Sequence, residues 1–180
     1  MAKRKLGYGS EPLGRKIDQP KYVKNKPVEV ISKPLGPKYE LTDNVRFHRG
    51  EKLYQIRALR DFDNVKVGDL GGYVAGEHNL SHDGNCWLAQ RSISCGNGRV
   101  TENAWGMDDT VIKDDGILAG TTRICDRVQV RGSGWVKGAV ELYGDIIVGG
   151  KTILNDNHKF NTKEELSAFL KAEFEKRSRR

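Results

Sequence analysis

The stretch Gly84–Asn155, cut every six residues, reads GNCWLA, QRSISC, GNGRVT, ENAWGM, DDTVIK, DDGILA, GTTRIC, DRVQVR, GSGWVK, GAVELY, GDIIVG and GKTILN. The first position of each hexad is Gly, Asp, Glu or Gln, and it is Gly in seven of the twelve hexads. The third position is small or β-branched, and the fifth is aliphatic in ten hexads, the exceptions being Ser94 and Gly106. An unbroken repeat of such short period is typical of a solenoid. A helix is excluded, because six residues advance a helix by about 600° and turn the apolar stripe away from the core.

This repeat predicts a β-helix. Positions three and five of a hexad lie two residues apart, so both point to the same side of a short strand, which is the inside of the coil. Positions one and two form the corner, where Gly, Asn and Asp tolerate positive φ. Three hexads close one triangular turn of eighteen residues. We therefore expect an all-β fold whose centre is a single-stranded β-helix of about four turns.

The flanking sequence predicts three further parts. Residues 1–37 form an extended basic arm that contains all five prolines, since residues 1–40 carry ten Lys or Arg against four Asp or Glu. Residues 38–83 form a β-hairpin cap, with strands at 39–43 and 52–59 and a turn at 48–50. The coil follows over 84–155, and 156–180 contain an amphipathic helix that covers the last turn. The helix signals are a capping box and an apolar stripe, formed by Thr162 with Glu165 and by Leu166, Phe169, Leu170 and Phe174.

Composition excludes several classes of protein. No apolar run has the roughly 18 residues of a membrane span, and the basic N-terminus lacks the apolar region of a secretory signal. The cysteines Cys86, Cys95 and Cys125 form no CxxC pair, which disfavours a disulfide framework or a zinc ribbon and suits a reducing compartment. We expect no metal and no cofactor, no membrane contact, and a location in the cytoplasm where the protein is made, or in a virion.

The hexads resemble the hexapeptide repeat of left-handed β-helix proteins, in which a small residue follows an aliphatic one four positions later. Val100 with Ala104 and Ile124 with Val128 follow this rule. Residues 66–74 (KVGDLGGYV) and 79–88 (NLSHDGNCWL) are similar to the segment that leads into the coil of hexapeptide-repeat proteins found in bacteria and their phages, which are often unassigned or named as transferases. The resemblance covers residues 38–155. It implies a β-helix and homotrimers, and it carries no definite activity.

The fourth position of each hexad is expected to point outward. Two of the three outer faces then carry mostly apolar residues, which neighbouring subunits, the arm or the helix would cover. On the first face, Trp87, Trp105 and Arg123 form a ladder of two aromatic rings and a cation, and Trp135 lies on the third face. We take these four as candidate binding residues. The alternatives are a packing stripe and a platform for nucleic-acid bases, the latter without a basic frame.

Acyl transfer is the chemistry with the best precedent in this family, which commonly uses a His base at a subunit interface and a thioester of coenzyme A or an acyl carrier. The chain has four histidines, at positions 48, 78, 82 and 158, and all lie outside the twelve hexads. His78 and His82, next to the start of the coil, are the weak catalytic candidates. The acidic pairs at 108–109 and 114–115 lie at corners, where solvated carboxylates are expected rather than calcium ligands.

Three functions remain open at this point. The first is a non-enzymatic structural or binding protein, phage-encoded, whose arm attaches a rigid coil to the other proteins of a larger assembly such as a capsid or tail. The second is a hexapeptide-class acyltransferase, and the third is a phage inhibitor that binds a host defence protein. The arm can also bind nucleic acid, because five of its basic side chains can neutralise phosphates: Lys3, Arg4, Lys5, Arg15 and Lys16.

Overall fold

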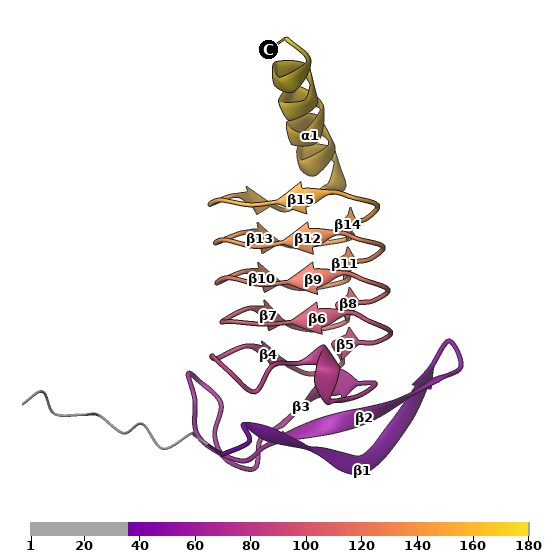
Figure 1. The fold of residues 1–180 in the computed structure, drawn as a ribbon, viewed down its shortest axis with the longest axis vertical. Coiled ribbons are helices and arrows are strands. Elements are labelled where there is room, and N and C mark those ends of the chain that lie inside the picture. The colour runs from indigo at the N-terminus through magenta and orange to yellow at the C-terminus, as the bar shows by residue number, and fades with distance from the viewer. Residues whose placement is uncertain (1–35, 180) are drawn as a thin grey trace, which may run out of the picture. The chain divides into compact units, whose positions relative to one another are not determined.

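A computed structural model describes residues 36–179 and shows a β-helix with a hairpin before it and a helix after it (Figure 1). The predicted fold class is confirmed, and the coil has about five turns rather than four. The elements are β1 (Tyr39–His48), β2 (Glu51–Ala58), β3 (Leu70–Val74), the short 3-10 helix η1 (Glu77–Asn79), β4 (Trp87–Leu88), β5 (Ile93–Ser94), β6 (Arg99–Val100), β7 (Trp105–Gly106), β8 (Val111–Ile112), β9 (Ile117–Leu118), β10 (Arg123–Ile124), β11 (Gln129–Val130), β12 (Trp135–Val136), β13 (Glu141–Leu142), β14 (Ile147–Val148), β15 (Ile153–Leu154), β16 (Lys159–Phe160) and α1 (Lys163–Ser178).

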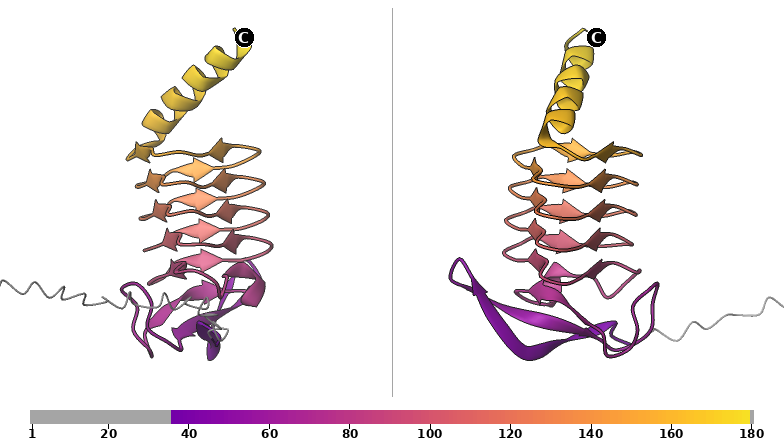
Figure 2. Two further views of the ribbon diagram at one scale, coloured as in Figure 1. Left: turned by 60° about the vertical axis from the view of Figure 1, so that its left-hand side comes forward. Right: turned by 180° about the vertical axis from the view of Figure 1, so that it is seen from behind.

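Each hexad contributes one two-residue strand to one of three parallel sheets. The first sheet runs β4-β7-β10-β13-β16, and the third runs β6-β9-β12-β15. The second contains β5-β8-β11-β14 and continues through β3 into β2 and β1. Partners in neighbouring turns are eighteen residues apart, as in the pairing of Trp87 with Trp105 and of Trp105 with Arg123. Figure 2 shows the turns stacked as successive layers. Neighbouring strands of a sheet are generally separated by roughly 4.8 Å.

The coil extends beyond the repeat at both ends, which corrects the expected span of 84–155. Before it, Tyr73 in β3 pairs in parallel with Ile93, and Leu80 forms a bridge with Val100. After it, β16 pairs with β13 and buries Phe160. A parallel strand needs only a backbone partner and an inward side chain. The first extension does not keep the eighteen-residue spacing, and the second has an aromatic residue at the aliphatic position, so the six-residue pattern detects neither.

The corner prediction is confirmed at every hexad. The first residue of all twelve hexads has positive φ, between 57° and 80°, whether it is Gly, Asp, Glu or Gln. Asp108, Asp114 and Asp126 also accept a hydrogen bond from the backbone N–H of the residue eighteen positions later, at 3.2, 3.1 and 2.7 Å. In residues 36–179 no three His, Cys, Asp or Glu side chains converge as metal ligands. The corner carboxylates therefore bind one turn to the next.

Replacing a corner carboxylate tests this role. We expect Asp126→Ala to lower the free energy of unfolding by about 2 kcal/mol, because it removes the acceptor for the Gly144 N–H and places at φ 59° an alanine, which tolerates this conformation less well than aspartate. Asp126→Gly loses the same acceptor but has no steric conflict at that φ, so it should cost clearly less. Urea unfolding of both variants measures the difference. Equal losses would contradict the backbone part of the argument.

The inward positions fill the coil. The third and fifth residues of the hexads are buried, except that Thr152 is half-buried. The two irregular fifth positions have local explanations. The Ser94 hydroxyl donates to the carbonyl oxygen of Gly98 at 3.0 Å, and a Cβ at Gly106 would lie 2.9 Å from the Leu88 side chain. Both residues therefore fit the first turns of the coil better than a large aliphatic one.

The hairpin is predicted correctly but does more than cap the coil. β1 and β2 pair antiparallel with His48 opposite Glu51, and β1 continues five residues beyond the expected end. β2 pairs with β3, so the hairpin extends the second sheet. Figure 1 shows its turn projecting past the edge of the coil.

The helix begins where the capping box places it. The Thr162 hydroxyl accepts from the Glu165 N–H at 3.2 Å, and the Glu165 carboxylate accepts from the Asn161 N–H at 2.7 Å. Most of the apolar stripe packs on the coil, since Leu166 is buried and Phe169 and Leu170 pack against the core, but Phe174 is 72% exposed. The helix rises away from the last turn (Figure 2), which corrects the expectation that the whole stripe would cover it. No helix within residues 36–179 is long and apolar enough to cross a membrane.

Candidate functional site

A cleft of about 230 Å³ lies where the end of the hairpin meets a corner of the coil. The corner is the one between the second and third sheets, at Gly96 and Asp114. The lining residues are His48, Arg49, Glu51, Cys95, Gly96, Lys113 and Asp114. It thus combines an imidazole, two cations and two carboxylates, drawn from two parts of the chain that are about 45 residues or more apart.

Glu51 fixes the hairpin to this corner. Both of its carboxylate oxygens accept from the Gly96 N–H, at 3.1 Å each. Two residues further along β2, Leu53 is fully buried and packs with Ile93 and Cys95. These contacts hold His48, which faces Glu51 across the hairpin, at the mouth of the cleft.

His48 is the histidine that lines this cleft, and its surroundings favour the neutral imidazole. Partial burial lowers the pKa of the imidazole below its usual 6.5, and the positive charges of Arg49, Arg46 and Lys113 lower it further. The ring is therefore neutral at pH 7 and keeps a lone pair that can accept a proton. The Lys113 side chain is only 14% exposed, so its charge acts in a partly desolvated place. A neutral base beside fixed cations can deprotonate a nucleophile and stabilise a developing oxyanion.

Cys95 lines the same cleft but is not suited to be a nucleophile. Burial and the negative charge of Glu51 raise the pKa of its thiol to about 11. The thiolate, which is the reactive form, is therefore scarce at neutral pH.

The two histidines expected as weak candidates lie close to the start of the coil, outside this cleft. His78 is exposed, and its Nε2 lies 2.9 Å from the carbonyl oxygen of Gly96, on the other side of the same corner. A carbonyl only accepts, so Nε2 carries the proton and Nδ1 keeps its lone pair. His82 accepts the Lys38 N–H on Nδ1 at 3.1 Å and stacks on Tyr39 with 4.3 Å between ring centroids. His82 therefore has a structural role in this geometry.

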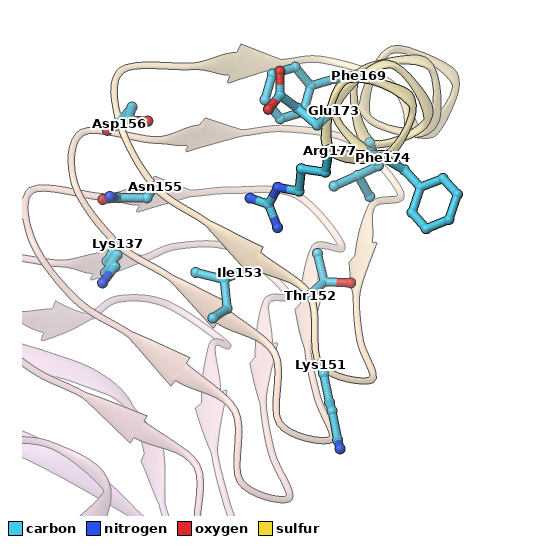
Figure 3. A pocket seen from close by; sticks show the side chains of 11 residues that line it. Lys137, Lys151, Thr152, Ile153, Asn155, Asp156, Phe169, Glu173, Phe174 and Arg177 are labelled. Carbon is cyan, nitrogen blue, oxygen red and sulfur yellow. The ribbon is translucent and has the colours of Figure 1, made fainter. Parts of the chain in front are cut away.

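A second, larger cleft of about 550 Å³ lies between α1 and the last turn (Figure 3). Its cations are Lys137, Lys151 and Arg177, and Arg177 reaches from the helix into the cleft. Ile153 and Phe169 supply an apolar wall. The remaining lining residues are Thr152, Asn155, Asp156, Leu170, Glu173 and Phe174. Such a cleft suits an elongated molecule with phosphates at one end and an apolar arm.

One edge of the coil connects the two clefts. The corner residues Gly96, Asp114, Gly132 and Gly150 stack in four successive turns, so the clefts are separated by roughly 14 Å along the coil axis. The residue next to the corner is basic in three of these turns: Lys113, Arg131 and Lys151. The edge between the second and third sheets thus carries Lys113 and Arg131 before the corner and Lys151 after it, together with the carboxylates of Asp114 and Asp115.

The outer aromatic ladder is largely covered. Trp87 is 2% exposed and packs edge-on against Phe62 at 5.3 Å, and Trp105 is 9% exposed with the Arg123 guanidinium 5.9 Å from its ring. The loop between β2 and β3 carries Phe62 onto this face, so packing accounts for the two Trp side chains. Trp135 on the third face is half-buried, and the Lys137 ammonium lies 4.1 Å from its ring. Of the predicted ladder, Arg123 is the exposed member.

The five basic residues expected to bind phosphates lie outside the described residues: Lys3, Arg4, Lys5, Arg15 and Lys16. The residues of the hairpin cleft were not singled out from the sequence. The available signal was that His48 begins the predicted turn at 48–50 and Glu51 follows it. Nothing in the pattern places that turn beside Lys113, because the contact depends on how the hairpin crosses the corner.

Comparison with known proteins gives one distant relative. The chain is 35% identical over 63 residues to the uncharacterized acetyltransferase YdcK of Escherichia coli (strain K12), a match that covers 30% of this chain and 19% of that protein. The chain therefore spans about a fifth of the length of the relative it matches. No family model matches the chain. The six-residue repeat, the observed β-solenoid and this distant match together support the predicted relationship to the hexapeptide-repeat β-helix proteins.

Proposed function

We propose that this protein is an acyltransferase of the hexapeptide-repeat class, which moves an acyl group from a thioester to a hydroxyl or amine. The observation that carries the proposal is His48, neutral at pH 7 and held beside Lys113 and Arg49 in a small cleft. The distant similarity to a protein named as an acetyltransferase supports the same reaction class.

Each residue of the hairpin cleft has its own role in the proposed reaction. His48 takes the proton from the acceptor O–H or N–H as its oxygen or nitrogen attacks the thioester carbonyl. Lys113 and Arg49 stabilise the negative charge on that carbonyl oxygen. The C–S bond then breaks, and the thiolate leaves as a thiol when it receives the proton from His48. The products are the acylated acceptor and the free thiol.

The donor proposed is a phosphate-bearing thioester such as an acyl-coenzyme A. Its phosphates would bind Lys151 and Arg177 in the helix cleft, and its flexible arm would follow the edge between the second and third sheets toward Lys113. Ile153 and Phe169 offer apolar contact at the start of that path. The two clefts have the spacing for this arrangement within one chain.

Donor binding can be tested separately from chemistry. We expect Arg177→Gln with Lys151→Gln to weaken acetyl-coenzyme A binding at least about tenfold in calorimetry, because each change removes a charged partner of a phosphate. Lys163→Gln with Lys171→Gln is the matched control, since it removes the same number of positive charges from residues of α1 that lie outside this cleft. Equal effects of the control and the cleft variants, or no binding by the unmodified protein, would reject this donor site.

The pH dependence of transfer follows from the lowered pKa of His48. A base with a pKa below 6.5 stays unprotonated, and thus active, as the pH falls from 8 through 6.5. We expect the acid limb of kcat/KM for acetyl transfer to have its midpoint below pH 6.5. A midpoint at or above pH 6.5 would indicate a base whose pKa is unshifted or raised, and it would argue against His48 as the base.

The assembly hypothesis, with a homotrimer attached through the arm to a virion or to nucleic acid, stays a prediction. Attachment through the arm rests on residues 1–35, which lie outside the described residues. The homotrimer is supported by outward apolar side chains that are well exposed in one chain, such as Ile147 at 47% and Ile153 at 56%.

A further inference from the structure

A lysine is fully buried at the start of the coil, beside a cysteine. The Lys38 ammonium nitrogen lies 2.8 Å from the carbonyl oxygen of Cys86, 3.4 Å from that of Gly84 and 3.2 Å from the Cys86 sulfur. Lys38 and Cys86 are both 0% exposed. Among residues 36–179, no carboxylate lies within ion-pair distance of this nitrogen.

This environment favours the uncharged forms of both groups. Burial lowers the pKa of the Lys38 amine, and burial also raises the pKa of the Cys86 thiol. A buried ammonium without a paired carboxylate is costly, whereas a neutral amine can donate to the two carbonyls and keep its lone pair. That lone pair is a nucleophile in contact with sulfur.

The pair is buried but not remote from solvent. The Cys86 sulfur lies 3.4 Å from the Ser81 carbonyl oxygen and 3.7 Å from that of Asp83. Residues Asp83, Gly84 and Asn85 are exposed. A single loop therefore separates the sulfur from water, and a small uncharged oxidant needs only a local opening of that loop to reach it.

We propose that Lys38 and Cys86 form a covalent cross-link when the protein is exposed to hydrogen peroxide. The Lys38 amine, 3.2 Å from the sulfur, first takes the thiol proton and so supplies the reactive thiolate that burial alone disfavours. The thiolate attacks peroxide to give a sulfenic acid, and the released hydroxide takes the proton back from the ammonium and leaves as one water. The Lys38 amine then attacks the sulfur, an N–S bond forms, and the hydroxyl leaves as a second water with a proton from the amine. In total, the amine, the thiol and one peroxide give the link and two waters.

The link would close a loop of 48 residues between β1 and the first hexad. Like a disulfide, it would restrict the unfolded chain and hold the hairpin on the coil. We therefore expect the oxidised protein to unfold at a higher urea concentration than the reduced protein, and a thiol reductant to reverse the shift. This modification is independent of the acyltransferase proposal, because neither residue lines the two clefts.

The test is peptide mapping by mass spectrometry after treatment of the full chain with hydrogen peroxide. We use a Cys95→Ser, Cys125→Ser background, which leaves the pair intact and removes the other thiols. The expected result is a peptide that joins residues 38 and 86 with the loss of two hydrogens and disappears on reduction. A joined peptide that carries one additional oxygen also supports a cross-link of this pair, here through an N–O–S bridge, whose formation consumes two peroxides and releases three waters.

Two variants serve as controls for this test, and other oxidation products would overturn the proposal. Cys86→Ser and Lys38→Arg, each in the same background, should give no joined peptide and no reductant-sensitive shift of the urea midpoint. Sulfenic or sulfinic acid at Cys86 with Lys38 unmodified in the background protein would overturn the proposal, as would a disulfide between two chains. Because the background protein retains both residues, this outcome can be read even if either variant fails to fold.

Discussion

Gly120→Ala should unfold the coil at a far lower urea concentration than Gly150→Ala, although both glycines occupy the first position of a hexad with positive φ. At Gly120, where φ is 72°, an added Cβ would lie 2.3 Å from the carbonyl oxygen and 2.6 Å from the nitrogen of Gly138 in the next turn. Both contacts are with backbone, so relief requires two turns of the coil to separate. At Gly150, where φ is 61°, a Cβ meets nothing within 4 Å.

These two substitutions separate two free-energy costs that usually occur together, the strain of a positive φ and the clash of the added Cβ. An alanine with left-handed backbone loses about 1–2 kcal/mol, and that is the whole expected effect at Gly150. At Gly120 the clash adds to it and breaks the hydrogen bond from the Thr121 N–H to the Gly138 carbonyl, at 2.7 Å, so we expect more than about 4 kcal/mol. Urea denaturation followed by circular dichroism measures both. Similar losses would mean that the layers move apart more easily than this packing indicates.

Replacing His48 should almost abolish acyl transfer. We expect His48→Asn to lower kcat for transfer from acetyl-coenzyme A by about 10²–10⁴-fold, the usual contribution of a positioned general base, with little change in donor affinity. The amide of Asn keeps polar contacts at the mouth of the cleft but cannot take a proton at neutral pH. Donor binding is retained because Lys151 and Arg177 lie roughly 14 Å away along the coil.

His78→Asn is the matched control. His78 contacts the same corner through the Gly96 carbonyl oxygen and retains a lone pair on Nδ1, but it lies outside the cleft. Its loss should therefore change kcat only a few-fold. A large loss with His78→Asn and a small one with His48→Asn would move the base to His78. Circular dichroism and unfolding midpoints of both variants exclude an effect on folding.

The coil illustrates how much of a fold a short repeat can specify. Every hexad from Gly84 to Asn155 needs the same three local features, a corner residue and two inward side chains, so the pattern can be read one residue at a time. The positive φ at all twelve corners and the buried third and fifth positions follow directly from it. The capping box placed the start of α1 for the same reason, since its contacts lie within four residues.

The candidate site was not predictable in this way, because its contacts are long-range. His48 and Lys113 are 65 residues apart, and they line one cleft because Glu51 binds the Gly96 N–H. The burial of Trp87 under Phe62 is also a long-range contact. Periodicity alone places Trp87 on an exposed outer face, but the structure covers it. Local periodicity therefore determined the coil, its corners and its inward residues. Only the tertiary structure decided how the hairpin and its loop cross the first turns. This crossing sets the pKa of His48, the burial of Lys38 and the position of the clefts, because burial and charge depend on neighbours that are remote in the chain.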